Sequence, residues 1–180
     1  MPQFPVACQQ ERLLSDNGMM KLRSILLVVC SVVLLAETVA GLKWTAPAGW
    51  KVESGSRPMR VATYTVGDAE CAVYFFGQGQ GGAVQANLER WKNQFQGGPE
   101  GKTGKRTIHG LPVTTIDVSG TYNGMTGPGS GGGAPKAGYR LLGAIVENPA
   151  GNVFFKFTGP AKTIADNQAK FDLLLNSVTK

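Results

Sequence analysis

A glycine-rich segment, residues 77–82, has the residue types and spacing of a phosphate-binding loop. Gly77, Gly79 and Gly82 match the pattern G-x-G-x-x-G. In a dinucleotide site such glycines let backbone N–H groups and a helix N-terminus hold a pyrophosphate. That site also needs a parallel sheet and an acidic residue after the next strand, and the sequence predicts neither. We therefore interpret the segment as a strand-to-helix connection and expect no cofactor; a looser anion site at the helix N-terminus is the alternative.

Three cations lie close together at Lys102, Lys105 and Arg106, and His109 follows them. Such a cluster could bind phosphate, lipid head groups or an acidic protein surface. Lysines at a strand edge also discourage aggregation between strands, which is the alternative interpretation. Nucleic acid is not an expected partner, because no aromatic residues alternate with the basic ones. These four residues are candidate ligand-binding residues.

The chain has too few nucleophiles and metal ligands to predict an enzyme. It contains one histidine, His109, and three cysteines, which leaves little material for a zinc site. Cys71 lies within an apolar run, a pattern typical of an inert buried thiol. We expect no catalytic or metal site. An unfamiliar hydrolase that pairs His109 with Asp117 is the alternative, and it requires these two side chains to converge.

Trp44 and Trp50 flank a short segment that contains proline and glycine. Two indole rings so placed could line a carbohydrate- or peptide-binding groove, and we include them among the candidate ligand-binding residues. An aromatic-lined pocket here would make the protein a small-ligand carrier. The alternative is that both rings close one end of the core, with their N–H groups bonded to nearby carbonyls.

The first forty residues predict export. Lys21 and Arg23 precede an apolar run over residues 25–35, and Thr38 and Ala40 supply small residues at a cleavage position. This is the pattern of a secretory signal peptide, and the run is shorter than the roughly 20 apolar residues of a membrane-spanning helix. We expect a polar extension or misplaced start at 1–19, a signal peptide at 20–40 cut near Ala40, and a secreted or periplasmic product without a membrane span. A retained anchor is the alternative.

Residues 41–180 are expected to form a single domain. The chain has 180 residues, a formal charge of +6 and 42% hydrophobic residues, which is enough for a packed core and excludes global disorder. Cys8 and Cys30 leave with the leader, so only Cys71 stays and no intramolecular disulfide can form. The stability of the domain must therefore come from its core.

The hydrophobic pattern predicts an α+β fold. A helix is expected over 83–95, where Val84, Leu88, Trp91 and Phe95 form one apolar stripe, and a second helix is expected after Pro160. Strand-like segments are joined mostly by short turns, which requires antiparallel neighbours. We predict an antiparallel sheet of about six strands, sandwiched with two amphipathic helices. Strands are expected at 43–45, 59–65, 70–76, 105–109, 112–122, 139–147 and 153–158.

Two segments carry a resemblance to a known family. The segment from Trp44 to Trp50 resembles the aromatic, proline, glycine and tryptophan opening of PsbP-like domains. The segment from Phe154 to Pro160, followed by a helix, is similar to their last strand and closing helix. Small bacterial secreted proteins of the same architecture are similar too. The resemblance implies this fold and a binding protein. The signal peptide, the missing catalytic residues and the glycine-rich loops beside the basic cluster lead us to expect a non-enzymatic binding or assembly factor of the cell envelope, with another envelope protein or an anionic surface as partner.

Overall fold

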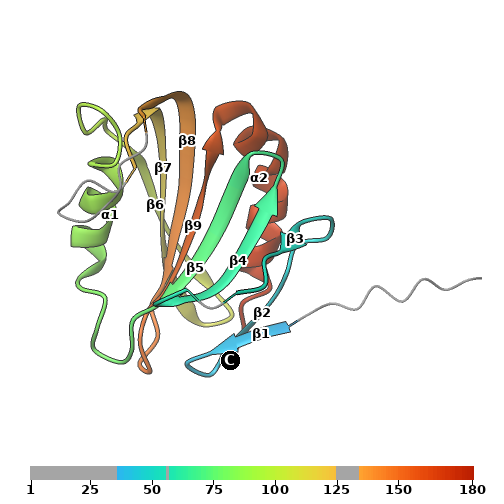
Figure 1. Ribbon diagram of the computed structural model, residues 1–180. Coiled ribbons are helices and arrows are strands. Elements are labelled where there is room, and N and C mark those ends of the chain that lie inside the picture. The colour runs from blue at the N-terminus through green and yellow to red at the C-terminus, as the bar shows by residue number, and fades with distance from the viewer. Residues whose placement is uncertain (1–35, 56, 125–133) are drawn as a thin grey trace, which may run out of the picture. The chain divides into compact units, whose positions relative to one another are not determined.

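The computed structural model describes residues 36–55, 57–124 and 134–180. The predicted N-terminal extension at 1–19 and most of the predicted signal peptide lie outside these residues. The described residues form nine strands and two helices (Figure 1). In chain order these are β1 Ala36–Val39, β2 Leu42–Thr45, β3 Lys51–Val52, β4 Arg60–Val66, β5 Ala69–Phe75, α1 Val84–Lys92, β6 Lys102–Ile108, β7 Leu111–Tyr122, β8 Lys136–Val146, β9 Val153–Pro160 and α2 Ala161–Asn176.

Seven strands form one sheet, in the order β3-β4-β5-β9-β8-β7-β6, and every neighbouring pair is antiparallel. The predicted α+β class, antiparallel sheet and two helices are confirmed. The strand number was wrong: the main sheet has seven strands rather than six, and β1 and β2 form a second, two-stranded sheet. The seventh strand, β3, has two residues, which is too short for an alternating pattern to reveal.

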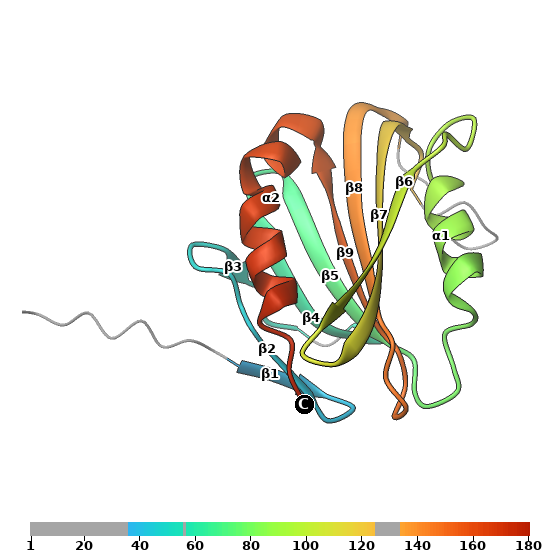
Figure 2. The ribbon, with the colours of Figure 1, turned by 180° about the vertical axis from the view of Figure 1, so that it is seen from behind.

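The sheet stands between the two helices, with α2 along one face and α1 along the other (Figures 1 and 2). Successive side chains of a strand point to opposite faces, so the strand β9 contributes to two cores. Phe155 and Phe157 pack with residues of α2, including Phe171. Phe154 packs on the other face with Trp91 of α1. Cover on both faces explains why the central strands are nearly continuous apolar runs.

The helix α1 approaches the sheet closely because β8 has a glycine beneath it. A Cβ atom placed on Gly143 would lie 2.3 Å from Cζ3 of Trp91 and 2.8 Å from Cγ2 of Ile116. The absent side chain at Gly143 therefore makes room for the indole ring. Trp91 is 4% exposed, so the helix buries its largest side chain against the sheet at this point.

The strand β2 is held on both sides. One side pairs with β1 through a turn at Ala40 and Gly41, whose φ angles are 54° and 75°. On the other side, the backbone N–H of Lys43 donates to the carbonyl of Thr179 at 2.8 Å, and the N–H of Thr179 donates back at 2.9 Å. The β1 strand and Ala40 belong to the segment predicted as signal peptide, and Gly41 is the first residue of the predicted domain. Cleavage after Ala40 would remove β1 and leave the pairing between β2 and the C-terminus.

Candidate functional site

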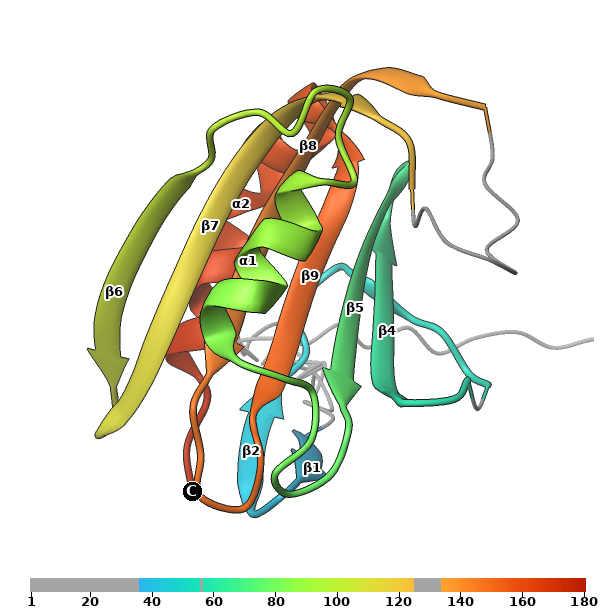
Figure 3. The same cartoon turned by 90° about the vertical axis from the view of Figure 1, so that its left-hand side faces the viewer.

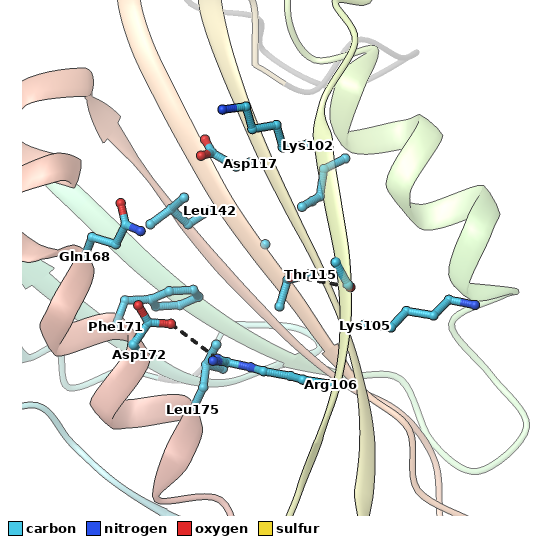
Figure 4. A pocket seen from close by; sticks show the side chains of 13 residues that line it. Lys102, Lys105, Arg106, Thr115, Asp117, Leu142, Gln168, Phe171, Asp172 and Leu175 are labelled. Carbon is cyan, nitrogen blue, oxygen red and sulfur yellow. Dashed lines mark hydrogen bonds and ion pairs between the residues drawn. The ribbon is translucent and has the colours of Figure 1, made fainter.

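The strand β6 is the last strand of the sheet at one side, and it carries the three clustered cations. We call Lys102, Lys105 and Arg106 the basic edge. Alternation along the strand places Lys102 and Arg106 on the face of α2, with Gly104 between them, and Lys105 on the face of α1. Figure 4 shows Arg106 reaching toward α2, while Lys105 extends to the opposite side of β6.

A groove of about 230 Å³ lies beside β6 on the face of α2, and we call it the α2 groove. Gly104 and Thr115 line it on the side of the sheet, and Phe171 and Leu175 line it on the side of the helix (Figure 4). Gly104 contributes no side chain, so the space between Lys102 and Arg106 stays open along β6. The groove therefore has an apolar wall, and its rim carries the cations of β6 together with the carboxylates of Asp117 and Asp172.

A second groove, the α1 groove, lies on the other face of the same strand, with a volume of about 460 Å³. Val84 and Leu88 of α1 line one side, and Thr103 and Lys105 of β6 line the other. The edge strand is thus flanked by a hollow on each face of the sheet. An extended chain laid along β6 would direct its alternate side chains into these two hollows.

The charges of the basic edge are only partly compensated. Nη2 of Arg106 lies 3.3 Å from Oδ1 of Asp172 on α2. No ion pair between described residues includes Lys102 or Lys105. Both lysines are exposed. The outer side of β6 therefore presents positive charge to whatever approaches it.

Asp117 is beside the α2 groove but its carboxylate is already paired. Arg140 donates to it from Nε at 2.8 Å and from Nη2 at 2.7 Å, and Nη2 also donates to Oε1 of Gln168 at 3.0 Å. The hydrogen bond and charge of Asp117 raise the pKa of Arg140. This two-pronged pair fixes the carboxylate in the sheet and leaves the basic edge as the dominant charge at the groove.

His109 and Asp117 do not converge. His109 is the first residue of the two-residue turn between β6 and β7, with a φ of 47°, and Gly110 follows with a φ of 78°. Its Nδ1 lies 2.9 Å from the carbonyl oxygen of Val178. Asp117 lies six residues beyond Leu111, the first residue of β7, which is a distance of about 20 Å along a strand. The geometry that the alternative hydrolase required is therefore absent between these two residues.

Trp44 and Trp50 lie in the core, where they are 1% and 6% exposed. Nε1 of Trp44 donates to the hydroxyl of Tyr64 at 2.7 Å, and Nε1 of Trp50 donates to Oδ1 of Asn167 at 3.3 Å. The ring of Trp50 packs on that of Phe157 with centroids 4.7 Å apart. Rings enclosed in this way have no free face for a ligand. The expectation that they line a groove is corrected to the alternative, in which they close the core, with the side chains of Tyr64 and Asn167 as acceptors.

The glycine-rich segment 77–82 connects β5 to α1, as expected, but the sheet beneath it is antiparallel. Its polar groups are used within the protein: Nδ2 of Asn87 donates to the carbonyl of Gly81 at 2.8 Å, and Nε2 of Gln78 donates to that of Pro149 at 3.2 Å. Within the described ranges, no three His, Cys, Asp or Glu residues gather in a way that could hold a metal ion. No described helix is long and apolar enough to span a membrane.

Sequence reasoning missed a lysine on the face of α1. Lys156 donates from Nζ to the hydroxyl of Tyr122 at 3.0 Å and lies 5.3 Å from the centre of that ring. Burial lowers the pKa of this amine to about 8. One signal was present: Lys156 stands between Phe155 and Phe157, as the sole charge of the apolar strand β9. A lysine in such a run must either reach water or find partners inside.

No protein-family model matches the sequence, and no curated protein matches it. The solution structure of the cyanobacterial PsbP protein from Synechocystis sp. PCC 6803 is similar, with a TM-score of 0.51 and 15% identity, over 85% of this chain and 98% of that one. The crystal structure of a protein of unknown function from Pseudomonas aeruginosa matches with a TM-score of 0.44 and 14% identity, over 82% of this chain and 96% of that one. The arrangement of sheet and helices, together with the first of these similarities, shows that the chain has a PsbP-like fold.

Proposed function

We propose that the protein is an exported, non-enzymatic binding or assembly factor of the cell envelope. Its site would be the basic edge, and its ligand an extended acidic segment of a partner protein. The signal-peptide pattern of residues 20–40 supports export. The observation that carries the binding role is the edge strand β6, which has cations along it and a groove on each face.

An edge strand can bind an extended chain through its backbone. No described strand pairs with the outer side of β6. Backbone groups on that side are available to a segment that adds itself to the sheet. Such a complex gains affinity from main-chain hydrogen bonds and selectivity from the hollows that accept alternate side chains. The α2 groove and the α1 groove lie where those side chains would go.

The charge of the edge favours an acidic ligand. Lys102 and Lys105 are exposed and lack ion-pair partners among the described residues. A segment with carboxylates would compensate both charges as its backbone pairs with β6. Attraction between opposite charges also speeds the encounter of the two molecules. Of the partners considered, an acidic protein segment uses both the strand edge and the charge, whereas an anionic membrane surface would use only the charge.

Charge reversal at the edge tests this function. The variant Lys102→Glu/Lys105→Glu is compared with wild type for binding a fluorescein-labelled peptide that alternates glutamate and valine, followed by fluorescence anisotropy. The peptide should bind wild type, and reversal of both charges should weaken binding about tenfold at low salt. The matched control is Lys51→Glu/Lys162→Glu, which makes the same change in net charge at exposed lysines of β3 and α2.

Four results would contradict the proposal. The first is that the peptide fails to bind wild type, and the second is that both double variants lose affinity equally, which would indicate an effect of net charge alone. The third is full competition between anionic lipid vesicles and the peptide, which would indicate a membrane-facing role for these lysines. The fourth is that the neutral Lys102→Gln/Lys105→Gln variant only aggregates, which would indicate a protective role. Binding that depends on the basic edge and resists competition by vesicles supports the proposal.

A further inference from the structure

A cluster of aromatic rings and cations lies on the face of the sheet that α1 packs against. We define the tyrosine–cation cluster as Arg60, Tyr74, Tyr122, Tyr139 and Lys156. Figure 3 shows that α1 crosses in front of β8 and β9, while β4 and β5 stand beside it without a helix in front of them. The cluster comes from the strands β4, β5, β7, β8 and β9, and its three tyrosines pack, partly buried, against the core that lies under α1.

The cations of this cluster lie over aromatic rings. The guanidinium carbon of Arg60 is 5.3 Å from the centre of the Tyr74 ring, and Nζ of Lys156 is 5.3 Å from that of Tyr122. The rings of Tyr122 and Tyr139 stack with centroids 5.9 Å apart and planes 7° apart. Tyr74, Tyr122 and Tyr139 are half-buried. The cluster therefore places half-buried aromatic rings next to positive charge.

Lys156 has no counter-ion among the described residues, because none of their ion pairs includes it. The internal segment 125–133, which is outside the described residues, contains no aspartate or glutamate. The nearby carboxylate, Glu70, already pairs with Arg60 at 2.9 Å and Arg57 at 3.5 Å. A largely buried ammonium group without a carboxylate carries a desolvation cost that a bound anion would offset.

A second polar group on the same face has no hydrogen-bond partner in the described part of the chain. Oγ1 of Thr158 is buried and makes no hydrogen bond among the described residues. Thr158 follows Lys156 by two positions on β9, so both side chains point to the face of α1. An anion held by Lys156 and the hydroxyl of Tyr122 would lie on the side of the strand where this oxygen is found. The hydroxyl of Thr158 could then donate a further hydrogen bond.

We propose that the tyrosine–cation cluster is a binding site for a small aromatic carboxylate. Its carboxylate would pair with Lys156 and accept a hydrogen bond from Tyr122, and its ring would pack against the half-buried tyrosine rings. This site is distinct from the basic edge, because none of its five residues belongs to β6. It goes beyond the proposed function and does not depend on it.

Benzoate is the probe for this site, with benzamide as its uncharged analogue and acetate as its non-aromatic analogue. The measurement is the Nζ nitrogen resonance of Lys156 in protein labelled with ¹⁵N-lysine, assigned from the spectrum of Lys156→Met. Benzoate should shift this resonance in a saturable way and keep the amine protonated to higher pH. Benzamide and acetate should bind about tenfold more weakly or worse, since each lacks one of the two interactions.

The control variant is Lys136→Met, because Lys136 also lies over a tyrosine ring, 5.4 Å from the centre of Tyr139, but is exposed. Benzoate should bind this variant as it binds wild type, and its affinity for Lys156→Met should fall about tenfold or more. Tyr122→Phe keeps the ring and removes the hydroxyl, so it should weaken the binding of benzoate by a smaller factor than Lys156→Met does. Equal binding of benzoate and benzamide, loss of binding in Lys136→Met, or no saturable shift of Lys156 would overturn the proposal.

Discussion

His109 illustrates how a residue with catalytic potential can have a structural role. It is the first residue of the turn between β6 and β7, where φ is 47°. Two-residue hairpin turns with positive φ at both positions favour Asn followed by Gly, and Gly110 already fills the second position.

We expect His109→Asn to have a free energy of unfolding within about 1 kcal/mol of wild type, because asparagine adopts this conformation readily. His109→Val should be less stable than His109→Asn by about 1–2 kcal/mol, because a branched side chain is strained there. Both variants lose the imidazole contact with Val178, so their comparison isolates the backbone effect. Urea denaturation measures the difference, and equal stabilities would contradict this account of the turn.

Lys156 should make the stability of the protein depend on pH. Burial lowers its pKa to about 8 from an ordinary value of 10.5. Between these values the unfolded chain binds more protons than the folded one, so stability rises with pH. The charged groups that act on this amine are Arg60, Glu70 and Arg90. Tyrosine ionisation opposes the rise above pH 10.0, the ordinary tyrosine value.

We therefore expect the free energy of unfolding to increase from about pH 8 to pH 10, and Lys156→Met to remove this increase. The variant should also be more stable than wild type at pH 7, by at most about 3 kcal/mol, which corresponds to the full pKa difference. Urea denaturation over this pH range, with Lys136→Met as control, measures both effects. A wild-type curve that is flat, or that Lys156→Met leaves unchanged, would contradict the burial of this charge.

Single residues could be predicted where the surrounding pattern was informative. The burial of Trp91 follows from its place in an apolar helical stripe, and that of Cys71 from an apolar strand. Burial also raises the pKa of the Cys71 thiol, as expected for an unreactive cysteine. The contacts of Lys156 could not be predicted, because they join β9 to Tyr122 of β7, and long-range pairs of this kind depend on strand order.

At the scale of elements, the contact between α1 and β8 depends on one missing side chain. A methyl group at Gly143 would overlap Trp91 and Ile116. Gly143→Ala should lower the free energy of unfolding by about 1–3 kcal/mol, because the helix must move away or the indole must leave its preferred rotamer.

The double variant Gly143→Ala/Trp91→Leu tests the cause of this loss. If the indole ring is what the methyl group meets, the double variant should be more stable than the sum of the two single effects implies, by about 0.5–3 kcal/mol. Thermal or urea unfolding of the four proteins gives this coupling. Strictly additive effects would show that the two positions do not touch.

The extent of β6 could be predicted only in part. The sequence indicates a strand only from Lys105, because glycine and proline are frequent in the residues just before it. The strand begins earlier, at Lys102, because residues 102–104 pair with Thr115, Ile116 and Asp117 of β7. Pairing with a neighbouring strand overrides a weak local preference. The earlier start brings Lys102 onto the edge and Gly104 to the middle of it.

The order of the whole sheet follows from turn lengths only where strands are neighbours in the chain. The β6–β7 and β8–β9 pairs could be predicted from their short connections. The β5–β9 pair joins residues 78 to 88 positions apart, and it depends on Phe154, Phe155 and Phe157 covering both faces of the sheet. The burial of both faces of β9 is visible in the sequence as an apolar run, but the strands that lie beside β9 are not.

At the scale of the whole chain, processing of the N-terminus is a direct test of the export hypothesis. We expect the exported product to begin at Gly41, as measured by intact mass and N-terminal peptide mapping. The shortened chain should still fold, because β2 keeps its backbone hydrogen bonds to Thr179. The far-ultraviolet circular dichroism spectrum and the urea-unfolding curve of residues 41–180 check this. A product that retains residues 36–40, or an unfolded 41–180 chain, would contradict the expectation.

The proposal that β6 is a docking strand is tested most directly by amide hydrogen exchange, measured with and without the peptide that alternates glutamate and valine. The account predicts slower exchange for the peptide that spans Lys102–Ile108, which forms β6, and no change for Lys51–Val52 at the opposite side of the sheet. The Lys102→Glu/Lys105→Glu variant should lose this protection. Unchanged exchange in β6 when the peptide is bound, or protection confined to other elements, would contradict it.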